Sequence, residues 1–196
     1  ILPLAISSVT ATDANTVEVT FNQEVDQTTA EITGNYSIDN GITVSAASKT
    51  STNVVTLTTS NLTNNNYQLT INNVEDAATS TAAVNLQESF TYAIALSIES
   101  ITVQDKNTLL VDFNLDLDQG SAETATNYLV DNSIGNPASA TLGAVNKDQV
   151  SLVFASDLGD NTYALTVNNV NDESTLVSAS NLSDNFSYLP LAITSV

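Results

Sequence analysis

The side chains that usually carry out catalysis are largely missing from this chain of 196 residues. Histidine, cysteine, arginine, methionine and tryptophan are absent, so the usual proton-transfer group, thiol nucleophile and thiolate metal site are all lacking. No Gly-x-Ser-x-Gly elbow occurs, and no base is present for a serine triad. A glycosidase needs only two carboxylates, but each half of the chain is too short for the usual catalytic cleft. We therefore expect no enzyme activity.

Carboxylates are the reactive groups that the chain does supply. Twenty-two acids against three lysines give a net charge of −19, which attracts cations and repels nucleic acids and anionic lipids. Loop carboxylates suit Ca²⁺, and five acids are predicted to lie in turns near the joint between the two halves of the chain: Asp13, Asp116, Asp118, Asp172 and Glu173. No EF-hand spacing is present, so the alternative is that these acids are simply solvated. Calcium is the one cofactor that the composition suggests.

Four asparagines stand in the sequence Asn-x-Ser/Thr, the acceptor motif for N-linked glycans. They are Asn35, Asn61, Asn181 and Asn185. In a chain so rich in asparagine, serine and threonine the motif also arises by chance, so modification and coincidence both stay open.

A duplicated stretch organises the rest of the chain. Residues 62–76 return as residues 158–172 with 9 of 15 positions identical. Each copy contains an alternating run that begins at a tyrosine, Tyr67 in the first and Tyr163 in the second. The duplication predicts two domains of roughly 95 residues, each large enough to bury its own core.

Short alternating segments predict β-strands throughout both copies. The clearest strand holds Val17, Val19 and Phe21 on one side, with polar residues between them. Asn40-Gly41 is typical of a tight hairpin turn, and residues 28–31 would form a single helical turn. Seven short strands per copy, joined by brief connections, indicate an antiparallel β-sandwich.

Aromatic residues repeat in phase with the buried side of these strands. We expect the same three positions to lead the core of each copy, Phe21, Tyr67 and Phe90 in the first and Phe113, Tyr163 and Phe186 in the second. The two tyrosines also lie near the start of the penultimate strand, where a tyrosine hydroxyl can bond back to the preceding loop. The alternative is that both are ordinary core aromatics.

The order of these motifs resembles that of a known family. Residues 8–26 follow the pattern S-V-x-A-x-D-x-x-T-V-x-V-x-F-N-x-x-V-D, and residues 29–36, 55–62 and 67–76 continue it with T-A-x-x-x-x-N-Y, V-x-L-x-x-x-x-L and Y-x-L-x-I-x-x-V-x-D. Both copies therefore look like the bacterial Ig-like domain of S-layer proteins and large surface adhesins, a relative in shape of fibronectin type III modules. The chain departs from that family at residues 77–80, Ala-Ala-Thr-Ser, where a glycine-asparagine pair is common.

The resemblance implies a fold and a domain organisation. The fold would be all-β, with two tandem seven-stranded antiparallel Ig-like or fibronectin III-like sandwiches at residues 1–92 and 93–188. Residues 189–196 nearly repeat residues 2–9. They would be either the first strand of a further repeat or a strand exchanged between subunits.

These features predict a non-catalytic structural module of an extracellular prokaryotic surface assembly, such as an S-layer, an adhesin stalk or a filament. Its partners would be neighbouring copies of the same or similar repeats, with self-assembly and no nucleic acid. No run reaches the length of a membrane span, and we expect the protein to be extracellular or at the cell surface. The alternatives are an adhesive or carbohydrate-binding accessory module and a strand-exchanging filament subunit.

Overall fold

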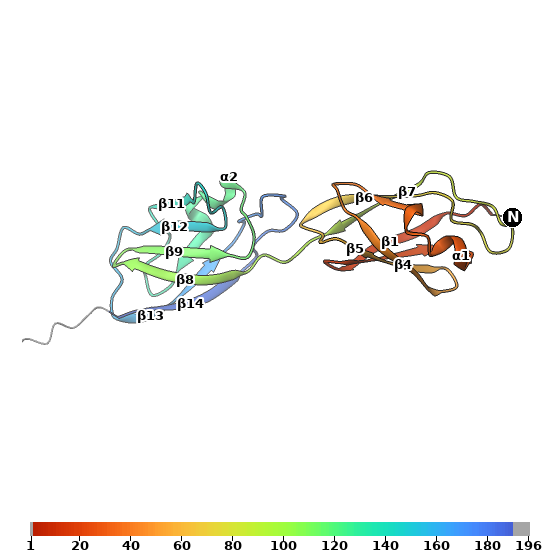
Figure 1. Ribbon diagram of the computed structural model, residues 1–196. Coiled ribbons are helices and arrows are strands. Elements are labelled where there is room, and N and C mark those ends of the chain that lie inside the picture. Colours follow the sequence, from red (N-terminus) through yellow and green to blue (C-terminus); the bar gives the residue numbers. More distant parts are fainter. Residues whose placement is uncertain (1, 190–196) are drawn as a thin grey trace, which may run out of the picture. The chain divides into compact units, whose positions relative to one another are not determined.

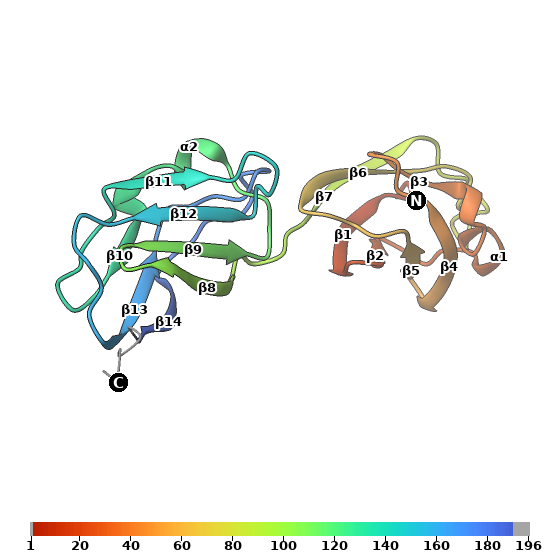
Figure 2. The same ribbon diagram turned by 60° about the vertical axis from the view of Figure 1, so that its left-hand side comes forward.

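The computed structural model describes residues 2–189. The chain divides between Ile94 and Ala95 into two compact units, and each is described by itself. Both units consist of antiparallel β-sheets with short helical turns (Figures 1 and 2). The prediction of an all-β, antiparallel chain is therefore confirmed for the described residues.

The first unit contains a four-stranded and a three-stranded sheet. The larger sheet has the order β1-β2-β5-β4 and consists of β1 (Ile6–Asp13), β2 (Thr16–Phe21), β5 (Val54–Thr59) and β4 (Val44–Ser51). The smaller sheet has the order β3-β6-β7 and consists of β3 (Tyr36–Ile38), β6 (Asn65–Ile71) and β7 (Leu86–Tyr92). Every pairing in both sheets is antiparallel.

The second unit repeats this topology. Its larger sheet, β8-β9-β12-β11, consists of β8 (Ile98–Asp105), β9 (Thr108–Phe113), β12 (Gln149–Val153) and β11 (Ser139–Leu142). Its smaller sheet, β10-β13-β14, consists of β10 (Tyr128–Val130), β13 (Asn161–Val167) and β14 (Leu182–Tyr188). In Figure 2 the strands of the larger sheet lie side by side, and β13 and β14 run in a separate layer.

Alternation along the strands explains which sides are buried. Val17, Val19 and Phe21 are at most 1% exposed, whereas the residues between them reach the surface. Antiparallel partners share a side of the sheet, and Val17 and Val19 accordingly lie opposite Leu57 and Val55. Each buried cluster draws residues from both sheets of its own unit. One apolar core therefore holds the two sheets of each unit together.

The core positions predicted for each copy are all buried. They are Phe21, Tyr67 and Phe90 in the first unit and Phe113, Tyr163 and Phe186 in the second. The rings of Tyr67 and Phe90 stack with their centroids 5.4 Å apart, and Tyr163 and Phe186 repeat this stack at 5.4 Å. Aromatic pairs at such separations contribute stability beyond the area that they bury. The core prediction is confirmed.

A single helical turn follows the second strand of each unit. Asp26 caps the first turn, because its Oδ1 accepts a hydrogen bond from the backbone N of Thr29 at 2.9 Å. Asp118 caps the second through Ser121 N at 2.8 Å. A capping aspartate satisfies an N–H that would otherwise lack an acceptor. The turns are α1 (Gln27–Ala30) and α2 (Gln119–Ala122), and the 3₁₀ turns η1 (Thr33–Asn35) and η2 (Ala125–Asn127) follow them.

An asparagine side chain holds the backbone just before the first strand of each unit. Asn22 accepts a hydrogen bond from Ala5 N at 2.9 Å and donates one to Pro3 O at 2.9 Å. Asn114 makes the same two bonds, at 2.7 and 2.9 Å, to the segment before β8. The amide of each asparagine therefore fixes the point at which the chain enters the unit.

The predicted further or exchanged strand, residues 189–196, lies outside the described residues except for Leu189. In the part that the structure describes, no helix has the length and apolar character needed to cross a membrane.

Candidate functional site

Three of the predicted calcium ligands, Asp13, Asp118 and Asp172, accept hydrogen bonds from backbone N–H groups of their own turns. Asp172 is only 2% exposed, and its carboxylate accepts hydrogen bonds from Ser174 N at 3.2 Å and Val177 N at 2.9 Å. Asp118 is the cap of α2. Because these oxygens already accept backbone N–H groups, all three residues have a clear role in loop structure.

The exposed predicted ligands are Asp13, which lies in the first unit, and Asp116 and Glu173, which are neighbours in the second, where Glu173 N donates to Asp116 O at 2.8 Å. Asp13 ends β1 and accepts a hydrogen bond from Asn15 N at 2.7 Å. Glu173 pairs with Lys147, and about half of each side chain is exposed. The pKa of Lys147 is raised, mainly by its hydrogen bond with Glu173 and to a lesser extent by nearby negative charges that include Asp116.

Within residues 2–189, no group of three or more acids is placed to hold a metal ion. The predicted site combines residues from two separately described units, so calcium binding stays a prediction. Thermal unfolding with calcium and with a chelator tests it, and an unchanged transition in chelator would contradict it.

The four predicted glycan acceptors differ in exposure. Asn61, Asn181 and Asn185 are exposed. Asn35 is 7% exposed, and its Nδ2 donates a hydrogen bond to Thr29 O at 2.8 Å. A buried and bonded amide is out of reach in the folded protein, so we expect Asn35 to remain unmodified. Modification of the other three stays a prediction, which intact-mass measurement tests.

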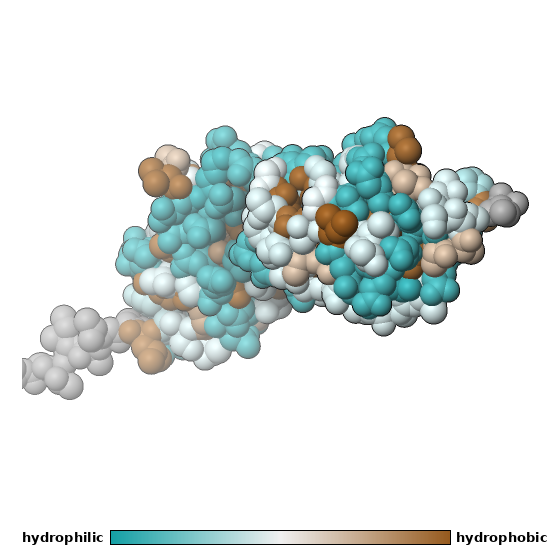
Figure 3. Space-filling model, turned by 45° about the vertical axis from the view of Figure 1, so that its right-hand side comes forward, coloured by the Kyte–Doolittle hydropathy of each residue, from teal (hydrophilic) through white to brown (hydrophobic). Residues whose placement is uncertain are grey.

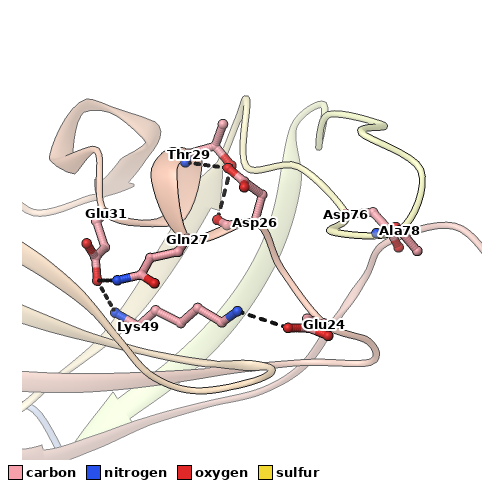
Figure 4. A network of polar contacts seen from close by, with 8 residues as sticks. All are labelled: Glu24, Asp26, Gln27, Thr29, Glu31, Lys49, Asp76 and Ala78. Atoms are coloured by element: carbon pink, nitrogen blue, oxygen red, sulfur yellow. Dashed lines mark hydrogen bonds and ion pairs between the residues drawn. The ribbon is translucent and has the colours of Figure 1, made fainter.

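A polar network joins α1 to neighbouring segments of the first unit (Figure 4). Lys49 joins two acids, since its Nζ pairs with Glu24 at 3.3 Å and its backbone N donates to Glu31 at 3.2 Å. Gln27 donates to the same oxygen of Glu31 at 3.2 Å. These contacts connect α1 to β4. The acids of the network, Glu24 and Glu31, therefore have a structural role.

All three lysines of the chain are paired with an acid. Besides Lys49 and Lys147, Lys106 pairs with Asp157 at 2.8 Å. The hydrogen bond with Asp157 is the main reason why the pKa of Lys106 is raised. Each positively charged side chain is therefore already neutralised by an acid of the same chain.

Tyrosine hydroxyls fasten loops to strands in both units. The hydroxyl of Tyr67 accepts a hydrogen bond from Thr63 N at 2.9 Å and donates one to Thr63 O at 3.0 Å. Tyr163 binds both backbone groups of Gly159 in the same way, at 2.9 and 3.2 Å. The predicted loop-binding role of these tyrosines is confirmed.

A second pair of loop-binding tyrosines was not predicted from the sequence. Tyr36 donates its hydroxyl proton to Ala30 O at 2.7 Å, and Tyr128 donates to Ala122 O at 2.8 Å. Burial raises the pKa of both hydroxyls, and the charge of Glu31 adds to the effect at Tyr36. The signal was present, because a tyrosine follows an alanine by six residues at equivalent places in the two copies.

Two hollows on the described surface do not gather unused acids. One, of about 400 Å³ in the second unit, contains two acids, Asp118 and Glu173, and these are the helix cap and the partner of Lys147. A hollow of about 310 Å³ in the first unit is lined by apolar, amide and hydroxyl side chains, namely Leu2, Pro3, Leu4, Gln23, Thr79 and Thr81.

The aromatic rings offer no exposed stacking surface. All 11 aromatic residues lie in the described part of the chain; nine are buried, and Tyr92 and Tyr188 are half-buried. On the face drawn in Figure 3, hydrophobic residues form small separate groups among hydrophilic and neutral ones. An exposed aromatic platform, which the carbohydrate-binding alternative would favour, is therefore not found in the described residues.

Comparison with known proteins identifies no family. No protein-family model matches the sequence, and no curated protein matches it. Among solved structures, domains 1–6 of the surface layer protein SbsC share 16% identity with the chain over 93% of its length, at a TM-score of 0.43. The N-terminal part of the bacterial S-layer protein SbsC gives 16% identity, 93% coverage and 0.44.

A third similar structure is the Escherichia coli adhesin FdeC, with 15% identity, 92% coverage of this chain and a TM-score of 0.31. The chain spans 25% and 43% of the two SbsC chains and 62% of the FdeC chain. Likenesses at these scores are too distant to decide the fold or the function. The resemblance to the bacterial Ig-like domain therefore stays a prediction.

Proposed function

We propose that the chain is a non-catalytic structural module of an extracellular surface assembly, built from two tandem Ig-like sandwiches of seven strands each. Support for the finer fold assignment comes from the four-stranded and three-stranded sheets that enclose one core in each unit. Two loop-binding tyrosines of the kind found at the corner of Ig-like sandwiches add to it.

The proposed role rests on one observation. The same contacts stabilise the fold in both units. Capping aspartates, stacked aromatic pairs, loop-binding tyrosines and strand-holding asparagines all occur at equivalent places. Among residues 2–189, the acids outside these contacts are largely exposed, and neither of the two hollows described above brings them together as a catalytic pair would require. Repetition of structural contacts is typical of modules whose task is to keep a shape.

The proposed partners are neighbouring copies of this or a similar repeat, and the proposed location is the cell surface. Immunogold electron microscopy with antibodies against the chain, applied to unbroken cells of its source, tests both. We expect a repeated label over the surface that disappears after external protease treatment. Label confined to the cell interior would contradict the proposal.

A further inference from the structure

The outer faces of the two three-stranded sheets carry no charged side chain. In β6 the buried Tyr67 and Leu69 alternate with Asn66, Gln68 and Thr70, which must point away from the core. Antiparallel partners share a side, so β3 and β7 complete the face. We call these the uncharged faces: Ser37, Asn66, Gln68, Thr70, Gln87, Ser89 and Thr91 in the first unit, and Leu129, Thr162, Ala164, Thr166, Ser183, Asn185 and Ser187 in the second.

Acids are present on these strands but belong to the other side. Glu88 is paired with the buried Leu69, and Asp184 with the buried Leu165, so neither projects from an uncharged face. One exposed acid flanks each face: Asp39 accepts a hydrogen bond from Gln68 N at 2.9 Å, and Asp131 accepts one from Ala164 N at 2.9 Å. The larger sheets differ, because Glu18 and Asp112 stand at outward positions of β2 and β9.

Charge limits how two copies of this chain can approach. Each copy carries a net charge of −19, and its three lysines already have acidic partners in the chain. A contact between two acidic surfaces would bring like charges within the screening length of about 8 Å in physiological salt. An uncharged face meets the least repulsion, so it is the surface on which a second copy fits best.

The chemistry of these faces also suits contact with an identical face. Serine and threonine hydroxyls, and asparagine and glutamine amides, both donate and accept hydrogen bonds, whereas a carboxylate only accepts. Cross-strand bonds already orient some of them, such as Thr91 Oγ1 to Asn66 Oδ1 at 2.6 Å and Thr162 Oγ1 to Ser187 Oγ at 2.9 Å. A symmetric pairing of like faces requires groups that can take either role.

We propose that the uncharged faces are the surfaces through which two copies of this chain bind each other, an inference that rests on the proposed structural role. Two seven-residue strands about 23 Å long and one three-residue strand about 10 Å long, spaced about 5 Å apart, present roughly 300 Å² per unit. This area lies below the ~800 Å² per partner of a stable complex, so a single contact is weak and many must act together.

Sedimentation velocity of the 196-residue chain tests this proposal. The test variant Ser89→Glu with Asn185→Glu puts one acid on each uncharged face, at exposed edge-strand positions. The matched control Ser48→Glu with Thr141→Glu adds the same charge to exposed edge-strand positions of the larger sheets. Circular dichroism and urea unfolding confirm that each variant is folded.

We expect the unmodified chain to self-associate weakly between about 10 µM and 1 mM, and more strongly at higher salt because repulsion is screened. The test variant should need at least tenfold higher concentration, whereas the control should behave as the unmodified chain. A chain that stays monomeric at every salt concentration, or two variants that weaken association equally, overturns the inference. Neither result would change the outcome of the immunogold labelling. The two experiments therefore distinguish failure of this inference from failure of the proposed function.

Discussion

The hydroxyls of Tyr67 and Tyr163 each satisfy an N–H and a carbonyl of the preceding loop. Tyr67→Phe or Tyr163→Phe should destabilise its unit by about 1 kcal/mol, because two backbone groups lose their partner while the ring still packs. Urea unfolding measures this loss. The control is Tyr92→Phe, a half-buried ring on β7, and an equal loss in the control would contradict a specific loop-binding role.

Thr59 ends β5 with a buried hydroxyl that has no hydrogen-bond partner. Thr59→Val keeps the shape and removes this unpaired group, so the first unit should become more stable by about 1 kcal/mol. Thr58→Val, at the exposed neighbouring position, is the matched control and should change stability far less. A destabilised Thr59→Val variant would show that the hydroxyl does bond within the fold.

Tyr36 and Tyr128 should make stability fall at alkaline pH. Burial raises the pKa of both hydroxyls above the ordinary value of 10.0. Above pH ~10 the unfolded chain releases these protons while the folded chain keeps them, so stability that is complete below this pH is lost as pH rises. Absorbance titration at 295 nm should show two tyrosines that ionise above the ordinary pKa. Uniform ionisation of all tyrosines near pH 10 would contradict this expectation.

At the scale of elements, the loop between β6 and β7 is organised by one buried acid. Asp76 is 4% exposed, and its Oδ1 accepts hydrogen bonds from Ala78 N and Thr79 N, both at 2.8 Å. Asp76 and Ala78 are drawn in Figure 4. Asp76→Ala should therefore destabilise the first unit by about 1–3 kcal/mol. Asp76→Asn retains an acceptor oxygen and should lose less. Equal losses in the two variants, measured by chemical unfolding, would contradict the hydrogen-bond explanation.

Alternation predicted the central strands well and the edge strands poorly. The alternation of apolar residues predicts β2, because a central strand buries one complete side, here Val17, Val19 and Phe21. The strand β4 (Val44–Ser51) contains mostly small and polar residues and pairs with β5 alone. Its sequence therefore shows no alternating pattern of apolar and polar residues.

Loop conformations were also hidden from sequence reasoning. Asn73 and Asn169 adopt φ values of 60° and 57°, and Asn85 and Asn181 adopt 51° and 50°. Glycine usually marks such left-handed positions, but asparagine tolerates them through local hydrogen bonds. The loops at residues 75–85 and 171–181 consequently read as plain polar segments, although their backbone is closely specified.

The candidate site was harder to predict than the fold. Asp172 and Asn35 are buried and hydrogen-bonded because their loops fold back onto the core. The positions of acids and acceptor motifs in the sequence do not reveal this loop conformation. The tyrosine prediction succeeded at Tyr67 because strand position alone places its hydroxyl beside the loop. It missed Tyr36, whose partner depends on the length of a helical turn.

At the scale of the whole molecule, the two apolar clusters have no residue in common. Phe21→Ala should therefore destabilise only the first unit, and Phe113→Ala only the second, each by about 3–5 kcal/mol. Urea unfolding of each variant should show one early transition and one unchanged transition. A single transition that shifts as a whole in both variants would contradict independent cores.

The side chains of Asn22 and Asn114 would bear load if the chain were stretched. We call the two hydrogen bonds of each side chain to the segment before the first strand the clamp. Tension that arrives along the backbone would reach the segment before β1 or β8 and load the two bonds of the clamp together. A backbone bond beside each clamp, from Asn22 N to Ala5 O and from Asn114 N to Ser97 O, would share this load. All of these bonds would have to rupture before the entering segment separated from its unit.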